Sequence, residues 1–212
     1  MPADILIALL GFAVASSITP GPNNLLVLTF GLNHGVARTM PLVLGISAGF
    51  AFMLLAVGIG LGAAIRANAN LHFATKVFGL AYMLWLAWKV ATSAPTLKIS
   101  NGERAAKPLS AFTGAMFQWV NPKAWAVALS ATGAYTAADA PYVSLAWIAS
   151  IFLVVAISSL SVWAAFGSFM QGLVDSPRKL RFFNVAMAVL LVASALPVAF
   201  EIATDLSGLK QD

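Results

Sequence analysis

The chain has 212 residues, of which 60% are hydrophobic and 9% charged, whereas a soluble domain carries roughly 25% charged residues. This composition excludes a soluble domain of any size and predicts an all-α integral membrane protein with one domain, residues 1–212. The formal charge of +5 does not predict nucleic-acid binding, because the basic residues lie between the apolar segments. Without cysteine, the chain has no disulfide and no thiol chemistry.

Six apolar segments long enough to cross a lipid bilayer follow one another along the chain. They are expected at about 5–30, 40–65, 71–91, 109–134, 142–167 and 182–202, with a polar connection at 92–108. In the second segment, Gly45-xxx-Gly49 and Gly58-xxx-Gly62 predict close helix packing. Pro197 is expected to interrupt the sixth segment.

The first segment is broken at residues 16–24, Ser-Ser-Ile-Thr-Pro-Gly-Pro-Asn-Asn. Pro20 and Pro22 have no N–H group, so the carbonyls of Ser16 and Ile18 lose their usual helical donors. Since lipid offers no water to replace those bonds, broken backbone at this depth must face protein or a water-filled cavity.

A new helix is predicted to begin at Pro22, because proline suits the first position of a helix. The free N–H groups near Asn23 and Asn24 carry the positive end of a helix dipole, which suits an anion such as an amino-acid carboxylate. Asparagine beside a break also caps a new helix, so ligand contact and capping both stay open for these two residues. Thr19 and Gly21 complete the candidate residues of this break.

The fourth segment contains a second break, in which Asn121 precedes Pro122 and is biased away from helical geometry. Lys123 follows, with fifteen uncharged residues on each side of it, which places it near the centre of the bilayer. A lysine at this depth predicts a functional site. Its ammonium could bind a substrate carboxylate, carry a proton, or pair with a carbonyl freed at the break, such as that of Gln118.

Pro22 and Pro122 lie 100 residues apart, each inside the first helix of a three-helix set. Because three is an odd number, the second set would be inverted relative to the first. The sequence therefore predicts two inverted three-helix repeats, about 1–92 and 108–208, with helices 1 and 4 broken near the midplane. Paired interrupted helices of this kind indicate the substrate site of a transporter.

Six spans would leave both chain ends on one side of the membrane. The first, third and fifth connections hold eight Lys and Arg residues, against three on the opposite side. Under the positive-inside rule, those connections are cytoplasmic and both termini lie outside.

Other polar residues predict little chemistry. His34 and His72 belong to no metal-ligand cluster, and the chain contains no nucleophile elbow, no zinc motif and no phosphate-binding loop. No enzyme activity, metal or cofactor is therefore expected. The serines of the fifth segment are expected to bond to their own helix or a neighbouring one: Ser158, Ser159 and Ser161. Two acidic residues are expected at a solvated interface: Glu201 and Asp205.

Thr19-Pro-Gly-Pro-Asn-Asn24 in the first segment, together with Asn121-Pro-Lys123 in the fourth, resembles the LysE/RhtB family of amino-acid exporters. The chain is most similar to the branch that exports cysteine and O-acetylserine, and the six-span layout extends the resemblance over the whole chain. The resemblance implies efflux of small amino acids across the bacterial inner membrane. The driving force would be an ion gradient, with a proton as the expected coupling ion.

One feature departs from the family pattern. Several members, notably the exporters of basic amino acids, carry an acidic residue in the second segment after the Gly-x-x-x-Gly pattern. Here Phe50 follows Gly49, and no carboxylate precedes Arg66. Since a cationic side chain would need a buried anion, lysine and arginine are not the expected substrates, and the proton-coupling residue stays unassigned.

The expected function is secondary active export of a small neutral amino acid, of the cysteine/O-acetylserine or homoserine/threonine type, by alternating access. The carboxylate of the substrate amino acid is expected to bind near Asn23 and Asn24 or at Lys123. Its ammonium is expected to bind carbonyls freed by the prolines. Thr19 and Gln118 are weaker candidates for ligand contact. A passive channel and a non-transporting assembly subunit stay open as alternatives, as does a homo-oligomer.

Overall fold

The computed structural model describes residues 1–92, 109–172, 174 and 176–208, and within them the regular structure is helical throughout. This confirms the all-α prediction for that part of the chain. The 92–108 connection lies almost wholly outside the described residues, and so do its three basic residues. The helices are α1 Ala3–Ile18, α2 Pro22–His34, α3 Val36–Gly58, α4 Leu61–Ala67, α5 Ala69–Ala91, α6 Ala111–Gln118, α7 Pro122–Tyr135, α8 Pro141–Phe169 and α9 Pro177–Gly208, with a 3₁₀ turn at Met170–Gly172.

Both predicted helix breaks are confirmed. α1 ends at Ile18, α2 begins at Pro22, and the two helices are bent by 54°. α6 ends at Gln118, and α7 begins at Pro122 after Asn121, which has extended backbone. In each case proline takes the first position of the new helix, where its missing N–H would have had no partner in the helix.

Two expectations about the other segments are wrong. The second segment is not one helix to residue 65, because α3 ends at Gly58 and the short helix α4 follows. Gly60 makes this turn with a φ of 110°, a conformation that glycine adopts without steric cost. Pro197 does not interrupt the last helix, since α9 continues through it. A proline removes one backbone hydrogen bond, and the intact turns on either side let a long helix tolerate that loss.

α3 and α8 pack against each other, and each also packs against the broken helix of the other half. α8 contacts α1 and α2, while α3 contacts α6 and α7. Glycines permit this close approach: a Cβ atom on Gly45 would overlap the backbone of Ala111, and one on Gly31 would overlap that of Ala164. The close packing predicted from Gly45-xxx-Gly49 is thus confirmed.

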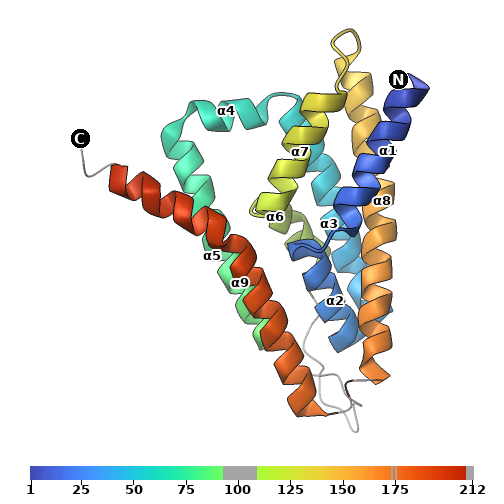
Figure 1. The fold of residues 1–212 in the computed structure, drawn as a ribbon, viewed down its shortest axis with the longest axis vertical. Helices are drawn as coiled ribbons and strands as arrows, with labels where there is room; N and C mark the ends of the chain where they lie inside the picture. The colour runs from blue at the N-terminus through green and yellow to red at the C-terminus, as the bar shows by residue number, and fades with distance from the viewer. Residues whose placement is uncertain (93–108, 173, 175, 209–212) are drawn as a thin grey trace.

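α5 and α9 form an antiparallel pair that leans away from the other helices, while α4 lies across one end and links α3 to α5 (Figure 1). The free ends of α1 and α9 lie toward the same end of the molecule (Figure 1). α9 also contacts α2. There the buried amides of Asn33 and Asn184 bond to each other in both directions, at 2.8 and 3.2 Å.

By length and hydropathy, three helices of the described chain can cross a membrane: α3, α8 and α9. The bent pair α1–α2 qualifies as a fourth if it forms one span. The protein is therefore a multi-pass membrane protein, and much of the outward surface of α9 is apolar, including Phe182, Val189 and Phe200.

Candidate functional site

The two helix breaks lie against each other, and three amide side chains join them. The Asn23 amide donates to Oε1 of Gln118 at 2.9 Å, and Gln118 donates back to Oδ1 of Asn23 at 3.2 Å. Asn121 donates to the same Asn23 oxygen at 3.2 Å. Gln118 and Asn121 are almost completely buried, and a buried polar cluster of this kind holds its members in one arrangement only while every partner is present.

The Asn24 amide gathers the carbonyls at the end of α1. Its Nδ2 lies 2.9 Å from the carbonyl oxygen of Ser17, 3.4 Å from that of Ile18 and 3.2 Å from that of Thr19. Ser159, on α8, donates to the Ser17 carbonyl as well, at 3.0 Å. The expected capping of the new helix is not observed, because α2 has Gly21 as its N-cap and no side-chain cap. The Asn24 side chain instead satisfies carbonyls that the break leaves at the end of α1.

Lys123 crosses from one break to the other. Its ammonium donates to the carbonyl oxygen of Thr19. Pairing with a carbonyl freed at a break was one of the three alternatives, but this carbonyl belongs to the first break and not to Gln118. Its backbone N–H bonds to Oδ1 of Asn121, which caps α7, at 3.1 Å. The lysine stem lies over Gly21, because a Cβ atom built there would stand 2.8 Å from Cδ and 3.1 Å from Nζ of Lys123.

A cavity of about 50 Å³, which we call the central cavity, lies between the breaks. One wall is polar and comes from the breaks, with Asn23, Asn24 and Lys123 among its residues. The opposite wall is apolar and comes from α3 and α8, with Phe50 and Phe152. This volume holds a few water molecules, so the cavity must widen before it can hold an amino acid.

The structure brings most of the predicted site residues together. Those that line the central cavity are Gly21, Asn23, Asn24, Asn121 and Lys123. Gln118 bonds to the Asn23 side chain through two reciprocal hydrogen bonds. Thr19 contributes its carbonyl oxygen, since its hydroxyl donates to the Ala15 carbonyl at 2.6 Å. Pro20 lies in the first break, and Pro22 and Pro122 begin the second half of each broken helix.

The apolar wall of the cavity was not predicted from the sequence. Ile46, Phe50 and Phe152 carry no local signal that separates them from other core residues. The role of Ser159 at the break was also not identified, although a bond to a neighbouring helix was one of its two expected roles. Ser158 follows the other role and donates to its own helix at Val154.

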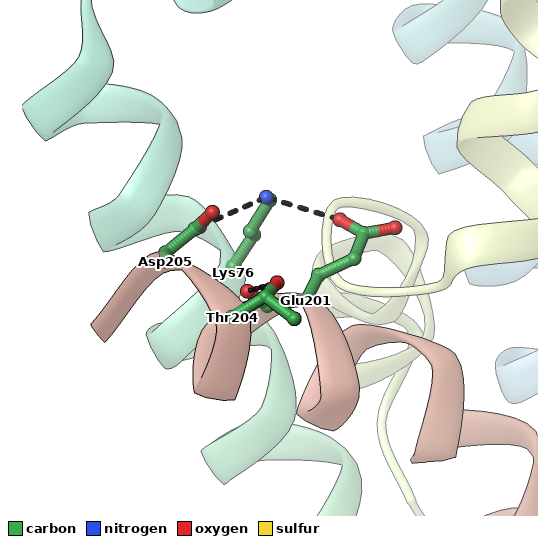
Figure 2. A network of polar contacts seen from close by, with 4 residues as sticks. All are labelled: Lys76, Glu201, Thr204 and Asp205. Atoms are coloured by element: carbon green, nitrogen blue, oxygen red, sulfur yellow. Dashed lines mark hydrogen bonds and ion pairs between the residues drawn. The ribbon is translucent and has the colours of Figure 1, made fainter. Parts of the chain in front are cut away.

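A second polar cluster joins α5 to α9. The Lys76 ammonium lies 3.0 Å from Glu201 and 3.1 Å from Asp205 (Figure 2). The Lys76 side chain is only 14% exposed. The carboxylates keep the exposure expected of them, at 60% for Glu201 and 40% for Asp205.

Proteins similar to this chain in sequence are translocators. The model of the LysE type translocators matches residues 14–201. The chain is 31% identical over 204 residues to the cysteine/O-acetylserine efflux proteins of Escherichia coli strains HS (O9:H4) and K12 and of Shigella sonnei strain Ss046. Each match covers 94% of this chain and 100% of the relative. No solved structure matches the chain significantly.

Proposed function

Since the chain belongs to the LysE type translocator family, whose members are transporters and not enzymes, we propose that it is a secondary active exporter of small neutral amino acids, by alternating access. Amino-acid efflux itself follows from the family and from the relatives. The substrate class rests on the central cavity and on the relatives, which are cysteine/O-acetylserine efflux proteins.

The hydrogen bond between Lys123 and the Thr19 carbonyl carries the proposal. A zwitterion has one group for each of these partners: its carboxylate would take the Lys123 ammonium, and its ammonium would take the Thr19 oxygen. Binding would then replace the bond that closes the gap between the two breaks. This gives the ligand a differential affinity for the two conformations, which an alternating-access cycle requires.

The lining of the central cavity supports a neutral side chain. Among the described residues that form it, Lys123 carries a positive charge and no residue is acidic. A lysine or arginine substrate would bring a second cation into this cavity without an anion to pair with it. The apolar wall at Ile46, Phe50 and Phe152 suits a short, uncharged side chain.

Packing supports the two inverted repeats, about 1–92 and 108–208. A two-fold axis would relate α1–α2 to α6–α7, α3 to α8 and α5 to α9. The contacts fit this relation, because α1–α2 packs on α8 just as α6–α7 packs on α3. The contacts of α3 with α8 and of α5 with α9 each join two equivalent helices. In this arrangement α5 and the broken pair α6–α7 are the remaining two of six spans. Arg38, Arg178, Lys179 and Arg181 would then face the cytoplasm, with both termini in the periplasm.

Counterflow in proteoliposomes tests this function. With the purified protein reconstituted, we expect labelled O-acetylserine to accumulate against unlabelled O-acetylserine inside, with a saturable rate, while lysine does not compete. An imposed pH gradient should accelerate net flux if the coupling ion is a proton. A flux that rises linearly with concentration would identify a passive channel instead, and no flux at all would favour a non-transporting assembly subunit.

A further inference from the structure

A second and larger cavity lies on the other side of the α6–α7 break. It measures about 250 Å³ against about 50 Å³ for the central cavity, and we call it the side cavity. α7 forms one wall, with Trp125 and Leu129, and α5 and α9 form the other, with Lys76, Val198 and Glu201. Trp119, at the start of the break, also lines it.

The second break separates the two cavities. Val120 and Pro122 line the side cavity, whereas Asn121 and Lys123, the alternate residues, line the central one. Only the backbone of residues 120–123 therefore separates a ligand in the central cavity from the side cavity. α6 and α7 are separate helices at this point, so that movement at the break does not require an intact helix to unwind.

The charges on the side cavity fit a zwitterion. An ammonium has three donors, so Lys76 can bind a carboxylate while it keeps its bonds to Glu201 and Asp205 (Figure 2). The cluster has two carboxylates for one ammonium, and Glu201 also faces the cavity. It can therefore accept the ammonium of a ligand. The Trp119 and Trp125 rings, 6.2 Å apart, supply an apolar surface for a side chain.

The side cavity also marks an asymmetry between the two halves. α2 packs against α9 through the reciprocal bonds of Asn33 and Asn184. α7 is the counterpart of α2 in the other half, and α5 is the counterpart of α9. Between α7 and the α5–α9 pair lies the side cavity. The molecule is thus closed at the α2–α9 contact and hollow at the equivalent place in the other half.

From these observations we propose that the side cavity is a second binding site for the zwitterionic amino acid, between the central cavity and the side of the membrane to which the substrate is released. Lys76 binds the carboxylate, Glu201 binds the ammonium, and the two tryptophans contact the side chain. The inference rests on the proposed export function, because it assigns to the side cavity the same substrate as to the central one.

The absence of cysteine in the chain permits a direct test. Leu129→Cys and Val198→Cys place a thiol on opposite walls of the side cavity, and Val127→Cys places one in the central cavity. Each variant is put into nanodiscs of phosphatidylcholine, and its modification by a small water-soluble maleimide is timed with and without O-acetylserine, which has no competing thiol. With O-acetylserine at five times its Kd, a competitive site slows modification about sixfold.

We expect O-acetylserine to protect both side-cavity thiols, and this protection to disappear when Lys76→Gln and Glu201→Gln are added, while Val127→Cys stays protected. In a Lys123→Ala background the reverse should hold: protection at Leu129→Cys persists and protection at Val127→Cys is lost. This second arm excludes the case in which substrate in the central cavity merely closes the side cavity.

Three results would overturn the proposal. The first is that neither side-cavity thiol, at Leu129→Cys or Val198→Cys, reacts with the maleimide. The second is protection of Val127→Cys alone, which leaves the export function intact and removes only the second site. The third is protection at Leu129→Cys that is lost with Lys123→Ala, because it would be indirect. If O-acetylserine protects none of the three thiols, the proposed substrate fails together with both sites.

Discussion

The Lys123 ammonium donates a hydrogen bond to the carbonyl oxygen of Thr19, 104 residues earlier in the chain, and so ties the second helix break to the first. The donor carries a charge and the acceptor is a backbone carbonyl beside Pro20, so the pair presents one group for each end of a zwitterion. Under the proposed function, a ligand that takes both partners would replace this bond.

Lys123→Ala is expected to lower export of O-acetylserine about 10- to 100-fold, because a hydrogen bond to a charged group contributes about 1.5–3 kcal/mol. Initial rates of counterflow in proteoliposomes measure the effect. Lys89→Gln is the matched control, since Lys89 is exposed and lies over the Trp85 ring, away from both breaks. Export at the unchanged rate in Lys123→Ala would remove the site assignment.

Gln118→Leu is expected to lower the stability of the protein, because Nδ2 of the partly buried Asn23 loses its acceptor, Oε1 of the fully buried Gln118. Each buried polar group left without a partner costs about 1–3 kcal/mol. Asn23→Leu together with Gln118→Leu should cost less than the sum of the two single changes. Thermal unfolding of the four proteins in one detergent gives the coupling, and strict additivity would show that the two amides act independently.

Gly21→Ala is expected to reduce export while the protein still folds. The new Cβ would displace the Lys123 stem, which lies 2.8 Å away at Cδ, and a lysine side chain can move aside. Gly11→Ala, in α1, is the control, because nothing lies within 4 Å of a Cβ atom at that position. There the substitution should be neutral or raise stability by about 0.5–1 kcal/mol. Equal export in the two variants would contradict the close contact between Gly21 and Lys123.

Gly45→Ala is expected to destabilise the protein by about 1–3 kcal/mol or more, since its Cβ would overlap the backbone of Ala111 and force α3 away from α6. Gly133→Ala, in α7, meets nothing within 4 Å and serves as the control. The measurement is the melting temperature together with the yield of monodisperse protein. A melting temperature unchanged in both variants would mean that α3 and α6 do not pack as closely as the glycine permits.

Much of the local structure could be predicted from the sequence. Both breaks occur where Pro22 and Pro122 stand, because a missing N–H and a fixed φ act within one or two residues. By contrast, the end of α3 at Gly58 was not predicted: the apolar composition continues across the turn, and only the conformation of Gly60 marks it. Pro197 gives the opposite case, a local signal that the packing of a long helix overrides.

The sequence alone determined a membrane protein of apolar helices with two interrupted ones, since hydropathy and proline act locally. Only the tertiary structure decided that the interruptions meet, that Lys123 takes the carbonyl of Thr19, that Ser159 supports the Ser17 carbonyl, and that Lys76 pairs with Glu201 and Asp205. These partners lie on different helices. The residue type fixes the length of a side chain, but only the folded chain decides which helix lies within that distance.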